Sequence, residues 1–282
     1  MNTTPATIPS TISRTAPSAL LAATVDVVRA VAATEVMPRF LNVGHSRKGD
    51  GSVVTAADLA AQSALAARLR EIVDGEFIGE EMTGAEQARA WAGGEHAAWC
   101  VDPIDGTSNF ACGLPGFAIS VALLRGGRPV LGVVYDPVRD EAFQAEAGQG
   151  AWLNALPLPL HRRDVRLRQA MAGIEFKRLD RALAATLTAS TPYCSQRSYG
   201  SSALEWCYAA AGRFDVYLHG GQKLWDFAAG WLIFQQAGGH CASLDQDEFW
   251  AGTVWEKSVI AALDPTLFAE WKAWLRAHHP LP

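Results

Sequence analysis

The hydrophobic pattern of the N-terminal part of the chain predicts two helices. Residues 18–37 show helical periodicity, with Ser18 as the N-cap and Pro38 where the helix ends or kinks. A second helix is predicted to begin at Thr55, with Asp58 at a capping-box position. Its apolar face is expected to contain Leu59, Leu65, Leu69 and Ile72. Asp58 is therefore explained either as a helix cap or as a site residue.

The middle of the chain shows short apolar runs that are typical of strands. Residues 118–124, 129–135 and 141–146 are predicted to form successive antiparallel strands, joined by turns at 125–128 and 136–137. Strand signals here follow helical signals in the first part of the chain. The order therefore predicts a mixed α/β protein rather than an all-helical or all-strand one.

Helices and strands also alternate in the C-terminal part. Helices are predicted at 202–211, 227–236 and 265–277, and strands at 214–218 and 258–262. No internal repeat interrupts this order. We expect residues 16–282 to form one unit, with two lobes of about 16–165 and 166–282.

Composition narrows the class of protein. With 282 residues, 49% of them hydrophobic, the chain can bury a large core, but its apolar runs are too short to span a membrane. Residues 1–15 lack the features of a signal peptide and are expected to be a flexible tail. The net charge of −5 argues against a general nucleic-acid binder. Five cysteines without a Cys-x-x-Cys pair favour reduced thiols and a cytoplasmic protein.

The segment 99–110 contains the most informative candidate chemistry. An apolar strand ends in the sequence Asp-Pro-Ile-Asp-Gly-Thr, which presents Asp102 and Asp105 together. The intervening proline donates no hydrogen bond, and the Ile104 carbonyl is a further oxygen ligand. The amides of Gly106 and Thr107, at the start of a short helix, would point at a phosphate oxygen. This arrangement predicts a site for phosphate and metal.

Two other segments present acidic residues in a similar way. Glu80 follows the apolar run 77–79 and is expected at the end of a strand. Asp226, in the sequence Trp-Asp-Phe-Ala-Ala-Gly, is expected as the N-terminal residue of a helix, where an N-cap role is the simple alternative. Two like charges about 4 Å apart repel by about 4 kcal/mol at an effective dielectric near 20, so converging acids require cations. All these ligands are oxygens, which favours Mg²⁺ or Mn²⁺ over zinc or copper.

These three motifs resemble the inositol monophosphatase family of magnesium-dependent, lithium-sensitive phosphatases. The signatures Gly-Glu-Glu, Asp-Pro-Ile-Asp-Gly-Thr-x-Asn-Phe and Trp-Asp-x-Ala-x-Gly occur in the family's order, and the resemblance covers nearly the whole chain. It implies a layered αβαβα sandwich with the site between two lobes, and a homodimer. It also implies two or three Mg²⁺ ions, held by Glu80, Asp102, the Ile104 carbonyl, Asp105 and Asp226.

The same resemblance implies the mechanism. Water activated by the cation attacks phosphorus in line, without a phosphoenzyme. Glu80 and Thr107 would position or deprotonate that water, with Asp58 behind Thr107. Gly106 and Thr107 would contact the phosphate, and Asp226 would hold the metal at the leaving group.

A different phosphatase class shares part of the central motif. Haloacid-dehalogenase phosphatases end a strand in Asp-x-Asp-x-Thr and use the first aspartate as a covalent nucleophile. Here the second acid follows three positions after the first, at 102 and 105. That spacing, together with the other two acidic motifs, favours the metal-dependent reading.

The residues expected to contact the substrate beyond its phosphate come mainly from the family resemblance. The family resemblance implies contacts by Asp105 and by the turn Gly200, Ser201 and Ser202, although the serines are equally explained as helix caps. Seven residues before Asp226, where the family has an acid, this chain has His219. This histidine, assisted by Lys223, would contact hydroxyls or a second phosphate; the alternative is an exposed loop histidine.

The expected substrate is a small phosphate ester. Inositol monophosphate or a similar polyol or sugar phosphate comes first, followed by 3′-phosphoadenosine 5′-phosphate, fructose 1,6-bisphosphate and histidinol phosphate. A hypothesis of another class is a regulatory partner of protein or RNA machinery on the same scaffold. A regulatory partner without catalysis would be expected to lose some of these acidic residues. The motifs are complete in this chain, which argues against that hypothesis.

Overall fold

The computed structural model describes residues 16–42, 45–47 and 53–279. The expected tail, residues 1–15, lies outside this range. A short strand, β1 (His45–Arg47), pairs antiparallel with β2 (Val53–Thr55). None of the helices in the described ranges is long and apolar enough to cross a membrane.

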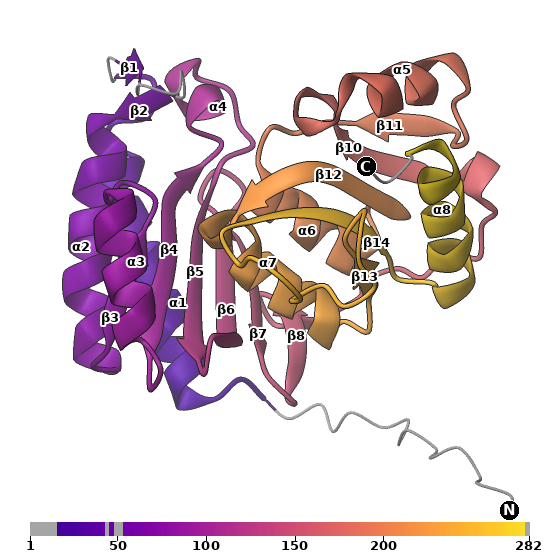
Figure 1. The fold of residues 1–282 in the computed structure, drawn as a ribbon. Helices are drawn as coiled ribbons and strands as arrows, with labels where there is room; N and C mark the ends of the chain where they lie inside the picture. The colour runs from indigo at the N-terminus through magenta and orange to yellow at the C-terminus, as the bar shows by residue number, and fades with distance from the viewer. Residues whose placement is uncertain (1–15, 43–44, 48–52, 280–282) are drawn as a thin grey trace, which may run out of the picture.

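Two sheets organise the molecule (Figure 1). The seven-stranded sheet has the order β3-β4-β5-β6-β7-β8-β9, and the five-stranded sheet has the order β11-β10-β12-β14-β13. The first contains β3 (Glu76–Gly79), β4 (Ala98–Asp105), β5 (Ala118–Arg125), β6 (Arg128–Asp136), β7 (Glu141–Glu146), β8 (Gly150–Leu153) and β9 (Leu156–Pro157). The second contains β10 (Met171–Glu175), β11 (Ser195–Arg197), β12 (Val216–Lys223), β13 (His240–Ala242) and β14 (Glu256–Ala262).

Helices form three layers around these sheets, which gives the expected αβαβα sandwich (Figure 1). Helices α1 and α2 cover the outer face of the seven-stranded sheet, α6 and α7 lie between the sheets, and α5 and α8 lie on the outer side of the five-stranded sheet. Helix α3 packs beside β3, and the short α4 follows β4. The helices are α1 (Ala19–Val31), α2 (Ala56–Ile72), α3 (Gly84–Gly93), α4 (Thr107–Ala111), α5 (Arg181–Ala189), α6 (Ser202–Ala211), α7 (Leu224–Gln236) and α8 (Pro265–His278). Shorter helical turns are η1 (Ala32–Val36), η2 (Leu167–Gln169) and η3 (Phe176–Arg178).

Strand β4 is buried on both faces because its side chains alternate between two cores. Trp99 and Val101 pack toward α1 and α2, whereas Ala98 and Cys100 pack toward α6 and α7. The inner side carries the smaller residues, and at Gly132 a Cβ would lie 2.9 Å from the Ala229 carbonyl oxygen of α7. Helix α7 can therefore sit close to the sheet, which brings its first turn to the end of β4.

Several predicted elements agree with the structure, and some bounds need correction. Ser18 caps α1 by accepting a hydrogen bond from the Leu21 amide, and α6 has the predicted bounds. Helix α7 begins three residues before the predicted start, so Asp226 lies within its first turn and Lys223 is the N-cap. Strand β12 extends to Lys223, beyond the predicted end at residue 218.

One predicted core position is wrong. Leu59 is 56% exposed, whereas Leu65 and Leu69 are fully buried. The buried face of α2 continues from Leu65 to Ala61 and Ala57 at intervals of four residues, and this spacing turns Leu59 toward solvent. The prediction was wrong because small alanines, rather than the large Leu59 side chain, form the buried face of this part of α2.

Candidate metal-dependent active site

Three aspartates from two different elements meet between the two sheets. One carboxylate oxygen from each of Asp102, Asp105 and Asp226 lies within 4.8 Å of the other two. The first two come from the end of β4, and the third comes from the first turn of α7. The structure therefore brings together residues that are more than 120 positions apart in the sequence.

The hydrogen bonds of this cluster come mostly from the backbone. Asp102 Oδ1 accepts a hydrogen bond of 2.9 Å from the Ile104 amide, and Asp226 Oδ2 accepts one of 2.9 Å from the Lys223 amide. Asp105 Oδ2 accepts from the Ser201 hydroxyl and the Ala203 amide, each at 2.7 Å. These contacts fix one oxygen of each carboxylate in place.

Burial makes the negative charge of these acids costly. Desolvation, followed by the charge of Glu80, raises the pKa of Asp102 well above its ordinary value. Desolvation likewise raises the pKa of Asp226, and it raises that of Asp105 to about 6. No lysine or arginine of the described residues forms an ion pair with the three aspartates. An oxygen-rich group of this kind fits a hard divalent cation such as Mg²⁺.

Glu80 lies at the end of β3, as the sequence predicts, and beside the aspartates. Its amide donates to the Val101 carbonyl of β4, and its charge acts on Asp102, Asp105 and Asp226. Parallel pairing of β3 with β4 places the two strand ends together, with Gly79 opposite Val101. Glu80 therefore joins the acidic cluster.

Asp58 combines the two roles that the sequence left open. Its Oδ2 accepts from the Thr55 amide and hydroxyl, at 2.8 and 2.6 Å, which closes the capping box of α2. Its Oδ1 lies 3.4 Å from the Thr107 hydroxyl, which is also 3.0 Å from the Ile104 carbonyl oxygen. One carboxylate thus caps a helix and faces the threonine next to the acidic cluster.

Gly106 is the N-cap of α4 and has a φ of +93°. A Cβ at this position would lie 2.9 Å from the Gly116 carbonyl oxygen, so the tight turn requires glycine. Thr107 is the first helical residue, which agrees with the predicted short helix. Both residues line a cavity of about 330 Å³.

This cavity opens over the acidic cluster and contains many of the residues expected from the sequence. Glu80, Asp105, Gly106, Thr107, Gly200, Ser201, Ser202, His219 and Asp226 line it. Ser201 both caps α6 and donates to Asp105, so its two explanations are also compatible. The Ser202 hydroxyl is buried in the structure without a hydrogen-bond partner. A substrate hydroxyl or phosphate oxygen would satisfy it.

Other predicted residues lie behind or beside the cavity. Asp102 and Ile104 are buried beneath its floor and do not line it. Lys223 also does not line the cavity, because its amino group forms an ion pair of 2.5 Å with Glu256. His219 is 6% exposed, so the alternative of an exposed loop histidine is wrong.

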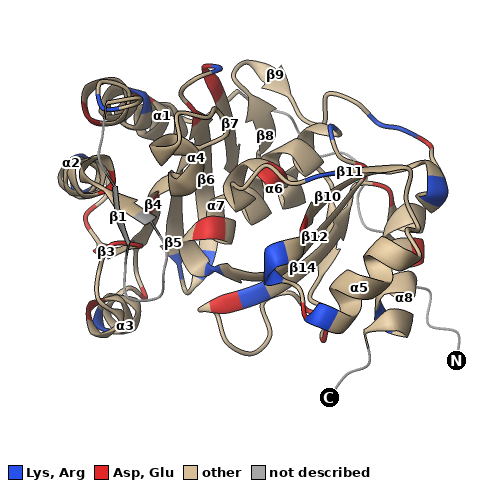
Figure 2. Ribbon diagram, turned by 90° about the horizontal axis from the view of Figure 1, so that it is seen from above, with Lys and Arg blue, Asp and Glu red and all other residues tan. Residues whose placement is uncertain are grey.

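Sequence reasoning missed four charged residues of the cavity. Glu205 comes from α6, and Glu175, Lys177 and Arg178 come from the end of β10 and η3. Burial raises the pKa of Glu205 to about 8, and its Oε1 accepts a hydrogen bond of 2.7 Å from the Tyr199 amide. In Figure 2, acidic and basic segments lie close together where β12 and β14 approach the start of α7. No sequence motif marks Glu175, Lys177, Arg178 or Glu205, so only the fold identifies these four residues.

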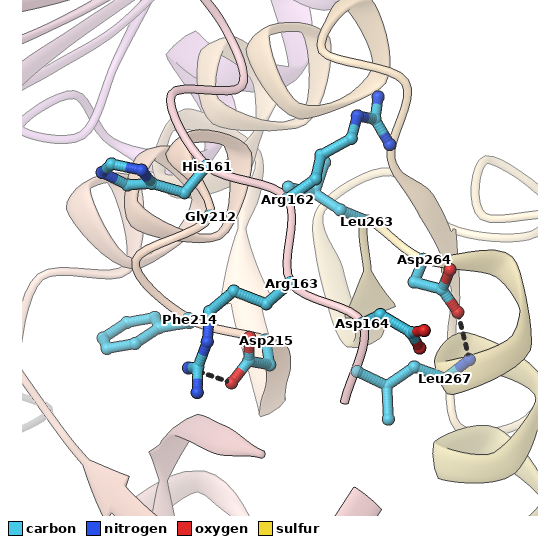
Figure 3. A pocket seen from close by; sticks show the side chains of 10 residues that line it. All are labelled: His161, Arg162, Arg163, Asp164, Gly212, Phe214, Asp215, Leu263, Asp264 and Leu267. Carbon is cyan, nitrogen blue, oxygen red and sulfur yellow. Dashed lines mark hydrogen bonds and ion pairs between the residues drawn. The ribbon is translucent and has the colours of Figure 1, made fainter. Parts of the chain in front are cut away.

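A second cavity, of about 220 Å³, has a different character (Figure 3). Its polar groups serve the structure around it: Arg163 forms an ion pair of 2.8 Å with Asp215, and Asp264 accepts from the Leu267 amide at the start of α8. None of the acidic cluster reaches it. The candidate active site is therefore the cavity between the two sheets.

Comparisons with known proteins identify the family of this chain. The chain matches the inositol monophosphatase family over residues 16–278. It is 39% identical over 196 residues to Nus factor SuhB of Pasteurella multocida (68% of this chain, 72% of that one). It is 36% identical over 210 residues to inositol-1-monophosphatase of Mesorhizobium japonicum (72% of this chain, 77% of that one).

A solved structure shows the same fold. Extragenic suppressor protein suhB of Bartonella henselae superimposes with a TM-score of 0.78 and 27% sequence identity, covering 92% of this chain and 99% of that one. The family match spans both sheets and all three acidic motifs. The chain belongs to the inositol monophosphatase family.

Proposed function

We propose that the protein is a Mg²⁺-dependent hydrolase of small phosphomonoesters. The observation that carries this proposal is the cluster of three aspartates, of which Asp102 is buried while Asp105 and Asp226 are half-buried and line the cavity. Desolvation and the mutual repulsion of the acids raise their pKa values, and a bound cation would stabilise the charged form. A cavity of about 330 Å³ has room for a polyol, sugar or nucleoside phosphate.

Residues of this chain would hold two or three Mg²⁺ ions, or Mn²⁺ ions in their place. Asp102, Asp105, Asp226, Glu80 and the Ile104 carbonyl are the proposed ligands. Bound Mg²⁺ supplies activation of water and neutralisation of charge on the phosphate. Carboxylate and carbonyl oxygens are the ligands that this ion prefers.

The remaining roles belong to the protein. Thr107 is held by Asp58 and by the Ile104 carbonyl, and we assign it the orientation of the attacking water. Glu80 would accept a proton from this water, because its carboxylate lies beside the cluster and lines the cavity. The amides of Gly106 and Thr107 would bind the phosphate, while Asp105, Gly200, Ser201 and Ser202 contact the rest of the substrate.

The first substrate to test is inositol monophosphate, since a relative is named inositol-1-monophosphatase. The screen measures phosphate release from it and from 3′-phosphoadenosine 5′-phosphate, fructose 1,6-bisphosphate and histidinol phosphate. Turnover that requires Mg²⁺ and stops with a chelator is expected for at least one compound. Absence of Mg²⁺-dependent release from every compound contradicts the proposal.

A second candidate is a regulatory role, because another relative is named a Nus factor. In that case the protein binds protein or RNA machinery, and the acidic cluster performs no catalysis. Tight binding to such a partner, without any phosphatase activity, would favour it. The uninterrupted set of acids and the net charge of −5 favour hydrolysis of a small molecule instead.

We further propose a cytoplasmic homodimer that lithium inhibits, as family membership implies. All five cysteines are free in the structure, which supports a reducing compartment. We also propose lobes of about 16–165 and 166–282, since each of these ranges contains one of the two large sheets. Measurement of the molecular size in solution tests the homodimer, and phosphatase assays with LiCl test the inhibition by lithium.

A further inference from the structure

The lining of the cavity contains two groups of opposite charge. Glu80, Asp105 and Asp226 form one group, which we call the acidic end. Lys177 and Arg178, which lie next to His219 through the pairing of β10 with β12, form the other, which we call the positive end. Among the described residues, neither Lys177 nor Arg178 forms an ion pair. Two positive charges thus line the cavity without an ion-pair partner in the described part of the chain.

The two acids at this end offset the positive charges only in part. Glu175 accepts from the Lys177 amide at 2.9 Å and from the Ser198 hydroxyl at 3.0 Å, so both of its oxygens are engaged. Glu205 has a pKa of about 8 because it is buried, and it is therefore mostly protonated at neutral pH. Lys177 and Arg178 together with these two glutamates therefore keep a net positive charge.

His219 has a defined tautomer. The Gly221 amide donates a hydrogen bond of 3.1 Å to Nδ1, so this nitrogen carries no proton. Burial and the nearby Arg178 charge lower the pKa of the imidazole to about 3, which keeps the ring neutral. The single ring proton is therefore on Nε2, which has no partner among the described residues. His219 thus offers the cavity a hydrogen-bond donor rather than an acceptor.

The backbone fixes Arg178 beside this histidine. Strands β10 and β12 are parallel and place Glu175 opposite His219, and η3 with Lys177 and Arg178 follows directly. At Gly220 a Cβ would lie 1.9 Å from the Arg178 carbonyl oxygen, so the two segments are in direct backbone contact. The Arg178 charge acts on both His219 and Asp226.

We propose that Lys177, Arg178 and the Nε2–H group of His219 form a subsite for a second anionic group of the substrate. This inference rests on the proposed phosphatase function and narrows its substrate class. With the reacting phosphate over the aspartates, a second phosphate on a sugar or nucleoside reaches the positive end. Compact bisphosphates are then preferred over monophosphates of neutral polyols.

The test compares two ligands that differ only in the second phosphate, adenosine 3′,5′-bisphosphate and adenosine 3′-monophosphate. Fructose 1,6-bisphosphate and fructose 1-phosphate form a second pair with another geometry. The wild-type protein is expected to favour a bisphosphate over its partner in kcat/KM by about 10- to 100-fold, the value of one charge-assisted contact. Arg178→Ala is expected to remove most of this preference, because the bisphosphate loses much more kcat/KM than the monophosphate does.

Two further variants sharpen the assignment. Arg181→Ala removes the same charge from an exposed position on neighbouring α5 that does not line the cavity, and it should keep the preference. His219→Gln retains a hydrogen-bond donor and should keep part of the preference for the bisphosphate. His219→Glu places an acceptor there and should abolish this preference.

Calorimetry separates this inference from the proposed function. Binding of the same pairs is measured with Ca²⁺ in place of Mg²⁺, and the preference and its loss in Arg178→Ala should appear in Kd as well. Equal binding of both members of each pair, or equal losses for both in Arg178→Ala, would overturn the subsite. No turnover of any ester with Mg²⁺, combined with a preserved binding preference, would overturn the phosphatase proposal alone.

Discussion

The two ends of the cavity differ in how the protein holds their charged side chains. At the acidic end, each aspartate lies at the end of a strand or in the first turn of a helix, and a backbone amide holds one of its oxygens. At the positive end, Lys177 and Arg178 are exposed on the short turn η3 and have no ion pair among the described residues. The first end is rigid before any ligand arrives, whereas the second depends on long, exposed side chains.

This difference separates catalysis from selectivity. A rigid acidic cluster can hold cations in one geometry, which the displacement at phosphorus requires. Flexible cations at the rim bind an anion without dictating its position closely. Changes at the acidic end should therefore lower turnover of all substrates, and changes at the positive end should alter the ranking among them.

The largest expected effect comes from the acidic end. Asp102→Asn keeps an oxygen that accepts from the Ile104 amide but removes the negative charge. Loss of several kcal/mol of metal-assisted stabilisation corresponds to a drop in kcat of roughly 10³-fold or more for every substrate. Steady-state assays check this, and circular dichroism should show an unchanged fold. Near-normal turnover in this variant would remove Asp102 from the proposed machinery.

A second effect concerns the stability of the folded protein. Glu205 has a folded pKa of about 8 and an ordinary value near 4.5, so folding favours its protonated form. The stability that this group contributes is fully present below pH 4.5 and is lost as pH rises through 8. Glu205→Gln, which cannot ionise, should raise stability at pH 9 by roughly 2–4 kcal/mol and change it little at pH 4.

Thermal unfolding of metal-free protein at both pH values measures this difference. Glu71→Gln, at an exposed position of α2, is the matched control and should have no pH-dependent effect. If Glu205→Gln shifts the unfolding temperature equally at pH 4 and pH 9, burial of the charge is not the cause.

A smaller effect is expected at Thr107. Thr107→Val keeps the shape of the side chain but removes the hydroxyl that joins Asp58 to the Ile104 carbonyl. Because the threonine orients the water and does not carry the charge, kcat should fall about 10- to 100-fold while KM stays similar. Thr107→Ser restores the hydroxyl and should recover most of the activity. A change confined to KM would assign Thr107 to substrate binding instead.

The sequence predicted the acidic end well because its residues occur in contiguous motifs. Asp102 and Asp105 follow an apolar strand and are separated by a proline, and this local pattern is visible without a structure. The αβαβα fold followed from the family resemblance, since the order of helices and strands is compatible with many arrangements. The start of α7 was placed too late because the N-cap is Lys223, which is not a typical capping residue.

The positive end could not be predicted in the same way. Arg178 approaches His219 only because β10 and β12 pair in parallel, and this pairing joins segments about 40 residues apart. The tautomer of His219 depends on the Gly221 amide at a bulge of β12, which no sequence pattern indicates. Lys223 looked suitable for substrate binding, but its neighbour Glu256 on β14 engages it.

Diffraction from a crystal soaked in Mn²⁺, with the anomalous signal of this ion, tests the central claim most directly. The account predicts at least one Mn²⁺ peak between Asp102, Asp105 and Asp226, with carboxylate oxygens at about 2.0–2.5 Å. The three aspartates in place without any ion at saturating Mn²⁺, or an ion bound only elsewhere, would contradict it.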